Sequence, residues 1–567
     1  MLSMNFLSIK ERIFNLFAID YRTLGVFRVL IAIIVVVDIF LRCRDFSAFF
    51  TEQGIIPRNY AINWFSGNST YSLYFINGGE IFSALLVILT LFFAVLLFFG
   101  YKTKLSTIMM FVMIHSLQMR CTILNSSGDD LLRVLLFWSI FLPLGKCFSV
   151  DAYLLSQNQQ KNPDNIDDIK KHDLKKHDLN FVVQSTSNAE EQTKPEHQEQ
   201  DHQEQDHQDV HFPKESTTVS NFFTFAILQQ ALFVYWVGAF LKNNPIWTEK
   251  FSAIEWTLHL GHFVTPIGTW FVNSMTSYLN PLTQFVLYLE LYAPLVMMVP
   301  IAQKYLRTTF MFLLIGMHLN FVLFMALGFF PFISITSLLL FFPSEGWNWL
   351  EKKEWFQNNF VTRFWTYLRN KFIPLHDYLN VYLSWASHRH HVSKIGTAIA
   401  IFAFGIVLHT NLNVIVPKSI PDNNLIVKRI RWGSGLYQNW TMFAPYPLKF
   451  TLWPKFVGTT KSGQEIDVFL SNHTFYGASV AFVDKRPENI LGNYTNYRWR
   501  KFHGNIRQDK YKYFRGNYAK YECQRYNELH SDDKITKISL KMGLQWSPVD
   551  GTSNRIGDID MGNYTCR

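Results

Sequence analysis

The sequence predicts an all-α polytopic membrane bundle of about eight to nine transmembrane helices with a small extracytoplasmic α+β domain at the C-terminus. Three observations support this fold class. Long apolar runs alternate with short polar segments along a chain that is 49% hydrophobic and only 17% charged. Lysine and arginine gather in alternate loops, which is typical of cytoplasmic loops. After residue 418 the long apolar runs stop, and strand-like alternation takes their place.

The apolar runs have nearly the length that a helix needs to cross a hydrocarbon core of about 30 Å. The runs 105–120 and 329–343 are short, so tilted or re-entrant helices are expected there. Spans are expected at 24–42, 80–99, 105–120, 131–147, 221–241, 282–300, 307–327, 329–343 and 396–416.

The basic residues predict the orientation of these spans. Lys10, Arg12 and Arg22 precede the first span and place the N-terminus in the cytoplasm. With nine spans, the other basic loops also lie in the cytoplasm and the C-terminal domain lies outside it. The membrane is expected to be the plasma membrane or the endoplasmic reticulum. The six Asn-x-Ser/Thr sequons all fall on the predicted outer side, which fits a glycoprotein; they begin at Asn68, Asn125, Asn439, Asn472, Asn493 and Asn563.

We divide the chain into four parts. Helices one to four occupy 1–154, and helices five to nine occupy 219–417, with a basic cytoplasmic segment at 344–395. Between them, residues 155–218 hold polar repeats such as His-Gln-Glu-Gln-Asp, which predict a disordered cytoplasmic insert because they offer little apolar surface to bury. The histidines of this repeat build no single ligand face on a helix, so no metal site is expected.

Residues 418–567 are expected to form the outer α+β domain. A hairpin is predicted around Ser462-Gly463, a strand over Ile538 to Trp546 and a helix over Tyr511 to His530. Cys523 and Cys566 are the cysteines that we would first expect to pair. The segment Trp440 to Pro445 is expected to pack on the membrane surface, where Trp and Phe are favoured.

The net charge of +10 is explained in part by the cytoplasmic loops, whose natural counter-charge is anionic lipid. Membrane lipids are therefore the expected partners, and nothing in the sequence indicates nucleic acid. A lipid-soluble small molecule is the expected type of substrate, and no protein partner is indicated.

Lys242, at the end of the fifth apolar run, is open to two interpretations. A cation at the mouth of a membrane helix often extends toward the lipid headgroups, with no further role. Alternatively, aromatic neighbours such as Trp247 remove the amine from water and favour its neutral form, which can act as a base.

Two further charged sets lie near membrane helices. Arg28 and Asp38 are roughly two to three turns apart in the first span, so a direct pair is not expected. Asp129 and Arg133 are spaced to pair on one helix face, as either a structural or a catalytic pair.

Short motifs in a specific order resemble the vitamin K-dependent gamma-carboxylase-like family, the HTTM proteins. They cover nearly the whole chain except the repeat insert. The motifs are Phe27-Arg28 with Asp38, Gly54 to Pro57, Asn125 to Asp130, Phe141 to Gly145, Ser149 to Asp151, Gln438 to Pro445, Arg498 to Lys501, and Tyr521 to Cys523 with Asn527 to His530.

The resemblance implies a carboxylase-like enzyme that uses vitamin K hydroquinone or a related quinone, with Lys242 at the position of the base. His318 is the second candidate catalytic residue, although a histidine in an apolar span can equally be a core residue. It resembles the first position of the family's His-x-x-Asn, with its asparagine one residue closer. The candidate substrate-binding residues are Asn125, Asp129, Asp130 and Asn320.

One departure from the family's pattern leaves two alternative functions open. The family has a functional histidine where this chain has Lys146, and an ordinary lysine cannot replace a neutral imidazole as a proton acceptor. The chain is therefore either a membrane enzyme with Lys242 as base or a non-catalytic HTTM-family membrane protein for binding, transport or assembly.

Overall fold

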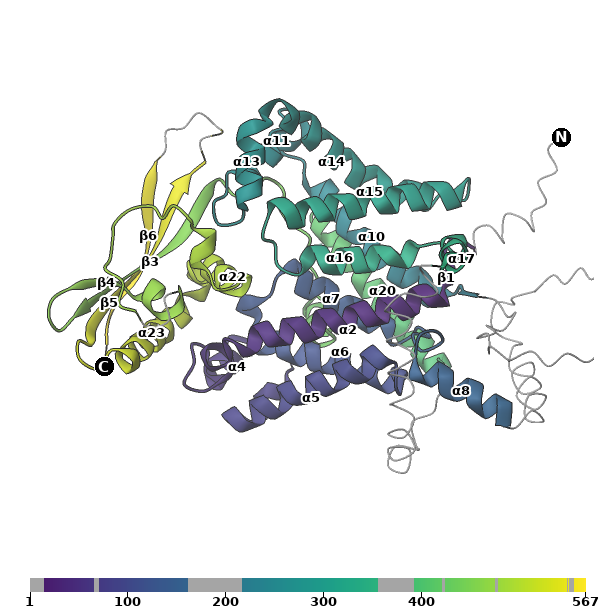
Figure 1. Cartoon of the computed structure of the whole chain (residues 1–567), viewed down its shortest axis with the longest axis horizontal. Coiled ribbons are helices and arrows are strands. Elements are labelled where there is room, and N and C mark those ends of the chain that lie inside the picture. Colours follow the sequence, from purple (N-terminus) through teal and green to yellow (C-terminus); the bar gives the residue numbers. More distant parts are fainter. Residues whose placement is uncertain are drawn as a thin grey trace, which may run out of the picture.

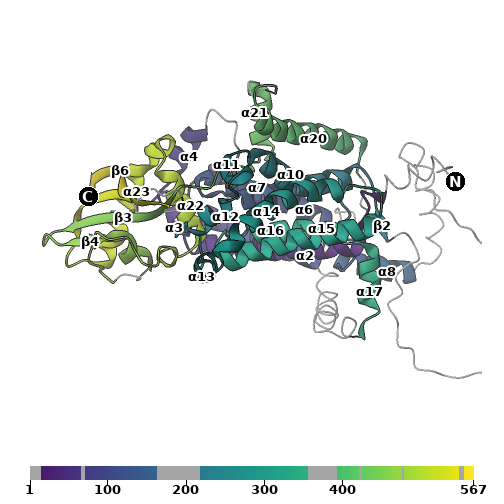
Figure 2. The same ribbon diagram turned by 90° about the horizontal axis from the view of Figure 1, so that it is seen from above.

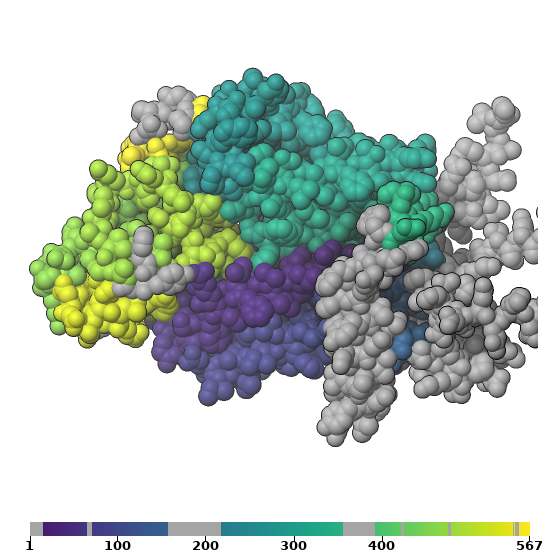
Figure 3. Space-filling view, in the orientation of Figure 1, coloured from purple at the N-terminus to yellow at the C-terminus, as the bar shows by residue number. Residues whose placement is uncertain are grey.

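The computed structural model describes residues 15–65, 71–161, 217–354, 392–420, 424–474, 478–547, 549 and 555–566. Its described part is mostly helical, with a bundle of long helices on one side and a four-stranded sheet with two helices on the other (Figure 1). The space-filling view shows the C-terminal domain in direct contact with both the N-terminal and the central helices (Figure 3).

The first part of the bundle is formed by helices that precede the insert. They are α2 (Tyr21–Cys43), α3 (Phe46–Phe50), α4 (Arg58–Phe65), η1 (Leu73–Phe75), α5 (Glu80–Phe99), α6 (Thr103–Arg120), η2 (Thr122–Leu124), α7 (Ser127–Ser139) and α8 (Val150–Lys161).

The second part follows the insert and completes the bundle. It consists of α10 (Phe222–Leu241), α11 (Pro245–Thr248), α12 (Ala253–Leu258), α13 (Pro266–Ser274), α14 (Thr276–Val296), α15 (Gln303–Phe324), α16 (Phe330–Leu338), η3 (Leu339–Phe341), α17 (Ser344–Glu351), α20 (Lys394–Ile415) and α21 (Leu425–Gly433). The view from above places α20 at the margin of the bundle (Figure 2).

A helix lies at each of the nine segments where a span is expected. Five of these helices (α2, α5, α10, α15 and α20) are long and apolar enough to cross a membrane, and they indicate a helical membrane protein. The helices at the other four segments include the two shortest of the nine, α7 with 13 residues and α16 with nine. In particular, α7 ends at Ser139 instead of reaching residue 147, because Pro143 and Gly145 follow closely and do not favour a continued helix.

The structure describes a few residues at each end of the predicted insert, 155–218. Helix α8 continues to Lys161, and Thr218–Val219 forms strand β2, which pairs antiparallel with β1 (Ile19–Asp20). Residues 162–216, which hold the histidine repeat, lie outside the described residues, as do residues 355–391 of the basic segment.

Arg28 is buried in the first long helix and is satisfied by backbone carbonyls. Its guanidinium donates to Leu97 O at 2.6 Å, to Phe98 O at 2.9 Å and to Phe148 O. These first two carbonyls end helix α5, where the helix dipole is negative, so the cation is stabilised without a carboxylate. Gly100 (φ +67°) permits this approach, since a Cβ there would lie 2.3 Å from Arg28 Nη1. As expected, Arg28 does not pair with Asp38.

The C-terminal domain contains a four-stranded antiparallel sheet in the order β4-β3-β5-β6. Its first strand begins at Phe450, whereas the preceding residues 434–449 reach the bundle, where Arg133 donates to the Gly435 and Tyr437 carbonyls. The elements are β3 (Phe450–Thr460), β4 (Glu465–Asp467), η4 (Leu470–Thr474), η5 (Leu491–Asn493), α22 (Tyr497–Ile506), η6 (Asp509–Phe514), α23 (Arg515–Leu529), β5 (Ile535–Trp546) and β6 (Ile556–Thr565).

These elements confirm the local predictions for the domain. The hairpin of β3 and β4 turns at Ser462-Gly463, and the alternating segment is strand β5. Most of the predicted helix is α23. Cys523 and Cys566 form the expected disulfide, which joins α23 to the residue after β6.

A buried polar cluster lies between η4 and α23. The side-chain amide of Asn472 donates to Glu522 O at 3.0 Å and to Glu522 Oε2 at 2.7 Å. His473 Nε2 lies 2.8 Å from Glu522 Oε1, and all three side chains are excluded from solvent. These contacts satisfy a carboxylate that would otherwise be costly to bury.

An ionic cluster joins the sheet domain to the bundle. Arg498 of α22 pairs with Asp38 of α2 and, at 3.0 Å, with Asp129 of α7. Arg42 completes the cluster, at 2.9 Å from Asp38 and 2.8 Å from Asp129. All four side chains are buried. The predicted pair of Asp129 with Arg133 is therefore wrong.

Arg133 pairs instead with Asp130, at 2.9 Å. Asp129 also receives hydrogen bonds from the backbone and hydroxyl of Ser126 at 2.7 and 2.8 Å, which begin helix α7 as a capping box. This cap turns Asp129 toward the start of the helix and toward Arg42 and Arg498.

Candidate functional site

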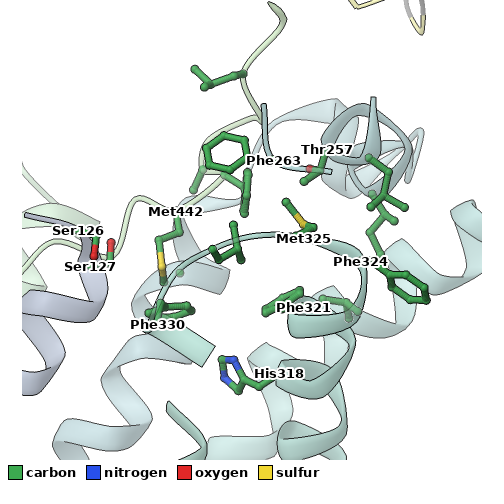
Figure 4. Close-up of a pocket in the computed structure, with 18 of the residues that line it drawn as sticks. Ser126, Ser127, Thr257, Phe263, His318, Phe321, Phe324, Met325, Phe330 and Met442 are labelled. Atoms are coloured by element: carbon green, nitrogen blue, oxygen red, sulfur yellow. The ribbon is translucent and has the colours of Figure 1, made fainter. Parts of the chain in front are cut away.

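A cavity of about 870 Å³ lies where α10, α14 and α15 meet the C-terminal domain. Much of its wall is apolar and aromatic. In the close-up, His318 and Phe321 face Phe330 and Met442 across this space, with Phe263 and Met325 farther along it (Figure 4). A space of this volume is sufficient for a lipid-sized or drug-sized molecule.

Lys242 lies in the wall of this cavity, at the end of α10. Its side chain is only 6% exposed, forms an ion pair with Glu290 of α14 and places Nζ 4.5 Å from the centre of the Trp247 ring. The aromatic neighbour expected from the sequence is therefore present. A lysine that extends into the headgroup region would be exposed, so that interpretation of Lys242 is wrong.

Local sequence explains how the lysine reaches this position. Helix α10 stops at Leu241, because Asn244 caps the next short helix, α11, and Pro245 stands at its first turn. The helix therefore ends beside α11, whose Trp247 ring lies over the Lys242 amine. Trp247 is fixed in turn by its indole N–H, which donates to Phe443 O at 3.0 Å.

Glu290 is a site residue that no sequence pattern singled out. It lies within the apolar segment Leu287 to Leu291, and a carboxylate inside a membrane helix is itself a signal of function or of a buried partner. Its partner could not be chosen from the sequence, because Lys242 and Glu290 are 48 residues apart and meet only when α10 packs on α14.

His318 is also part of the wall and is 1% exposed. Its Nε2 lies 2.8 Å from the Tyr235 hydroxyl of α10, while its Nδ1 has no hydrogen-bond partner among the described residues. One ring nitrogen is thus free toward the interior. The structure brings Lys242, Glu290 and His318 to the same cavity, on three helices.

Asn320 lines the cavity from the exposed side of α15, and its amide donates to Gly316 O at 2.8 Å. Asn125, Asp129 and Asp130 do not line it. Their loop contributes Ser126 and Ser127 instead. The Asn125 amide donates to Gln118 O at 3.0 Å.

Lys146 is exposed in the segment between α7 and α8, and it is not among the residues that line the cavity. The departure from the family's pattern therefore lies outside this site.

Within the segment Trp440 to Pro445, Trp440 is buried whereas Thr441 and Pro445 are exposed, and its packing on a membrane surface stays a prediction. Trp440 is 1% exposed, and its indole N–H donates to Gln438 Oε1 at 3.1 Å. That oxygen also accepts from Gln230 of α10 at 2.7 Å. Residues 441–444 line the cavity, so this segment forms part of its wall between the bundle and the sheet domain.

The C-terminal domain contributes a basic wall. Arg500, Lys501 and Arg507 line the cavity from α22 and the residue after it. His262 lies nearby and adds no charge at neutral pH, because burial lowers its pKa to about 3 and the adjacent Arg500 and Arg507 favour the neutral ring further.

Within the described ranges, no group of three or more His, Cys, Asp or Glu side chains is placed to hold a metal ion. No family model, curated protein or solved structure matches this chain.

Proposed function

We propose that this chain is a polytopic membrane protein related to the vitamin K-dependent gamma-carboxylase-like family, with eight to nine transmembrane helices. Helices at all nine expected segments support this count. The basic loops support a cytoplasmic N-terminus and an extracytoplasmic sheet domain. The Cys523–Cys566 disulfide supports the same side, since disulfides persist in oxidising compartments such as the endoplasmic reticulum lumen or the cell exterior.

The topology predicts protection of the C-terminus. A reporter fused after Arg567 should resist protease in sealed vesicles whose cytoplasmic face points outward, and detergent should abolish that resistance. A matched reporter at the N-terminus should be digested without detergent. Digestion of the C-terminal reporter in sealed vesicles would mean that one of the nine helices does not cross, and α16, with nine residues, is the first candidate.

We further propose that the cavity binds a lipid-soluble small molecule and that Lys242 is the base that receives its proton. The observation that carries this proposal is the buried Lys242–Glu290 pair in the wall of a largely apolar cavity. Desolvated ionisable groups beside a lipid-sized space are characteristic of sites that transfer protons. The free Nδ1 of His318 adds a second group that can exchange a proton in the same space.

A hydroquinone such as reduced vitamin K fits the residues present. Its ring system is apolar and flat, and the cavity offers aromatic faces: Trp247 beside Lys242, and Phe321 and Phe330 beside His318. When bound, it would supply the reducing equivalents and the acidic hydroxyl of the reaction that the resemblance implies.

The residues themselves can take and hold a proton. The charged form of Lys242 cannot accept one, so its proton must first pass to Glu290 across their hydrogen bond. Trp247 favours the charged form of Lys242 through its ring face, which helps the lysine to hold a proton after transfer.

Replacement of Lys242 tests the catalytic role. In vesicles with full-length protein, Lys242→Ala should reduce hydroquinone-dependent carbon dioxide fixation by about 100-fold or more, the usual scale for a lost general base. Lys250→Ala removes an exposed lysine eight residues away and should retain activity within about twofold. Folded yield by size-exclusion chromatography controls for collapse.

A second measurement does not depend on turnover. A quinone-sized compound should protect Lys242 from an amine-reactive reagent that enters the cavity, and it should leave the labelling of exposed Lys250 unchanged. If no such compound protects Lys242, the base role is wrong. The alternative, a non-catalytic membrane protein for binding, transport or assembly, would then be favoured.

A further inference from the structure

The charges in the cavity wall do not balance. Four cationic side chains line it (Lys242, Arg500, Lys501 and Arg507), and among the described residues Glu290 is the one carboxylate that does. Glu290 already pairs with Lys242. Three positive charges therefore border the cavity without a carboxylate in its wall.

Backbone and aromatic groups hold the two arginines. Arg500 donates to His262 O at 2.9 Å and to Ala326 O, and its guanidinium lies 4.6 Å from the centre of the Phe263 ring. Arg507 stands 5.3 Å from the centre of the Phe450 ring, and its Nε has no hydrogen-bond partner in the described chain. Neither guanidinium forms an ion pair with any residue that the structure describes.

Lys501 is the third cation. The carboxylates that act on it, Asp129 and Asp130, already form ion pairs with arginines. Burial lowers the pKa of its ammonium, while Asp130 and Asp129 oppose that shift from α7. Asp130 pairs with Arg133, and Asp129 pairs with Arg42 and Arg498. A partly buried cation in this situation gains most from a counter-charge that enters from outside the chain.

The opposite wall is apolar and reaches the outer surface of the bundle. Phe285 of α14 and Phe312 of α15 line the cavity and are also 50% and 54% exposed. If the bundle lies in a membrane, these side chains meet the acyl chains. A molecule can therefore be in contact with the lipid phase and the cavity at the same time.

We propose that a second ligand of this cavity is an anionic amphiphile, a lipid with a phosphate or carboxylate head. Its head lies at Lys501 and Arg507, and its apolar chain lies along Phe285 and Phe312 between α14 and α15. This inference rests on the proposed function, because it takes the same cavity as the ligand site. The hydroquinone proposed beside Lys242 is neutral, so the anionic amphiphile is a second class of ligand for this cavity, held at Lys501 and Arg507.

Binding of matched lipids to the full-length protein in neutral detergent tests this. Phosphatidic acid should bind at least about tenfold more tightly than phosphatidylcholine with the same acyl chains. The double variant Lys501→Gln with Arg507→Gln should lose about tenfold in affinity for phosphatidic acid and less than about twofold for phosphatidylcholine. The matched control Lys512→Gln with Lys520→Gln removes two exposed charges from the same domain and should change neither value.

Glycerol 3-phosphate separates a lipid head from a free anion. It should bind far more weakly than phosphatidic acid, and equal affinity would overturn the amphiphile. Equal affinity for the two lipids, or no loss in the double variant, would also overturn the inference while leaving a lipid-binding cavity. Failure of both lipids to bind would overturn this inference, whereas failure of a quinone-sized compound to protect Lys242 would overturn the proposed function.

Discussion

Replacement of Arg498 with methionine should destabilise the protein by about 3–5 kcal/mol, the scale for removing one partner of a buried ion pair. Arg498 faces both Asp38 and Asp129, and Arg42 alone would remain to neutralise two buried carboxylates. The loss should appear as a large decrease in the unfolding temperature of the detergent-purified protein, followed by tryptophan fluorescence. Protease sensitivity at the junction of bundle and sheet domain should rise with it.

Two variants control this measurement. Arg486→Met removes an exposed arginine of the same domain and should change stability by less than about 0.5 kcal/mol. Adding Asp38→Asn to Arg498→Met removes one of the stranded carboxylates and should recover part of the loss. A change below about 1 kcal/mol in the single variant would contradict the view that this cluster holds the two parts together.

Loss of the disulfide is the second large effect. Cys523→Ser with Cys566→Ser opens a loop of 43 residues, and the loop-entropy relation gives a cost of about 4 kcal/mol for that length. The sheet domain should unfold at a lower temperature and become sensitive to protease near α23 and β6. Dithiothreitol should shift the wild type in the same direction.

Cys43→Ser is the matched control. Cys43 is an exposed cysteine that forms no disulfide, and it lies on the predicted outer side of the membrane. It should leave the unfolding temperature unchanged under oxidising conditions. Equal stability of the double serine variant and the wild type would show that the packing of α23 on β5 and β6 is sufficient without the cross-link.

Patterns that depend on nearby residues predicted the fold well. Apolar runs predicted the helices at all nine segments, and a period of two predicted β5. These predictions succeed because the buried face of a helix or strand produces a regular spacing of apolar residues in the local sequence. Helix ends were less predictable. The capping box at Ser126 starts α7 four residues before the predicted run, and the chain leaves the helix before Pro143.

Partners across the fold were beyond the reach of those patterns. Local spacing predicted an ion pair between Asp129 and Arg133. The partners of Asp129 are instead Arg42 and Arg498, which are 87 and 369 residues away in the sequence. Spacing along one helix shows which residues share a face; it does not show which distant helix covers that face. For the same reason Lys242 was found, whereas Glu290 was not.

The buried Asn472 has a consequence for biosynthesis. Its side-chain nitrogen is the atom to which an N-linked glycan would attach, and in the folded domain it is fully enclosed and bonded to Glu522. Carbohydrate added there during translation would stand between η4 and α23 and keep the domain open. In a compartment that carries out N-glycosylation, modification and folding would compete at this asparagine. The sequon at Asn563, which is exposed on the edge strand β6, is compatible with both.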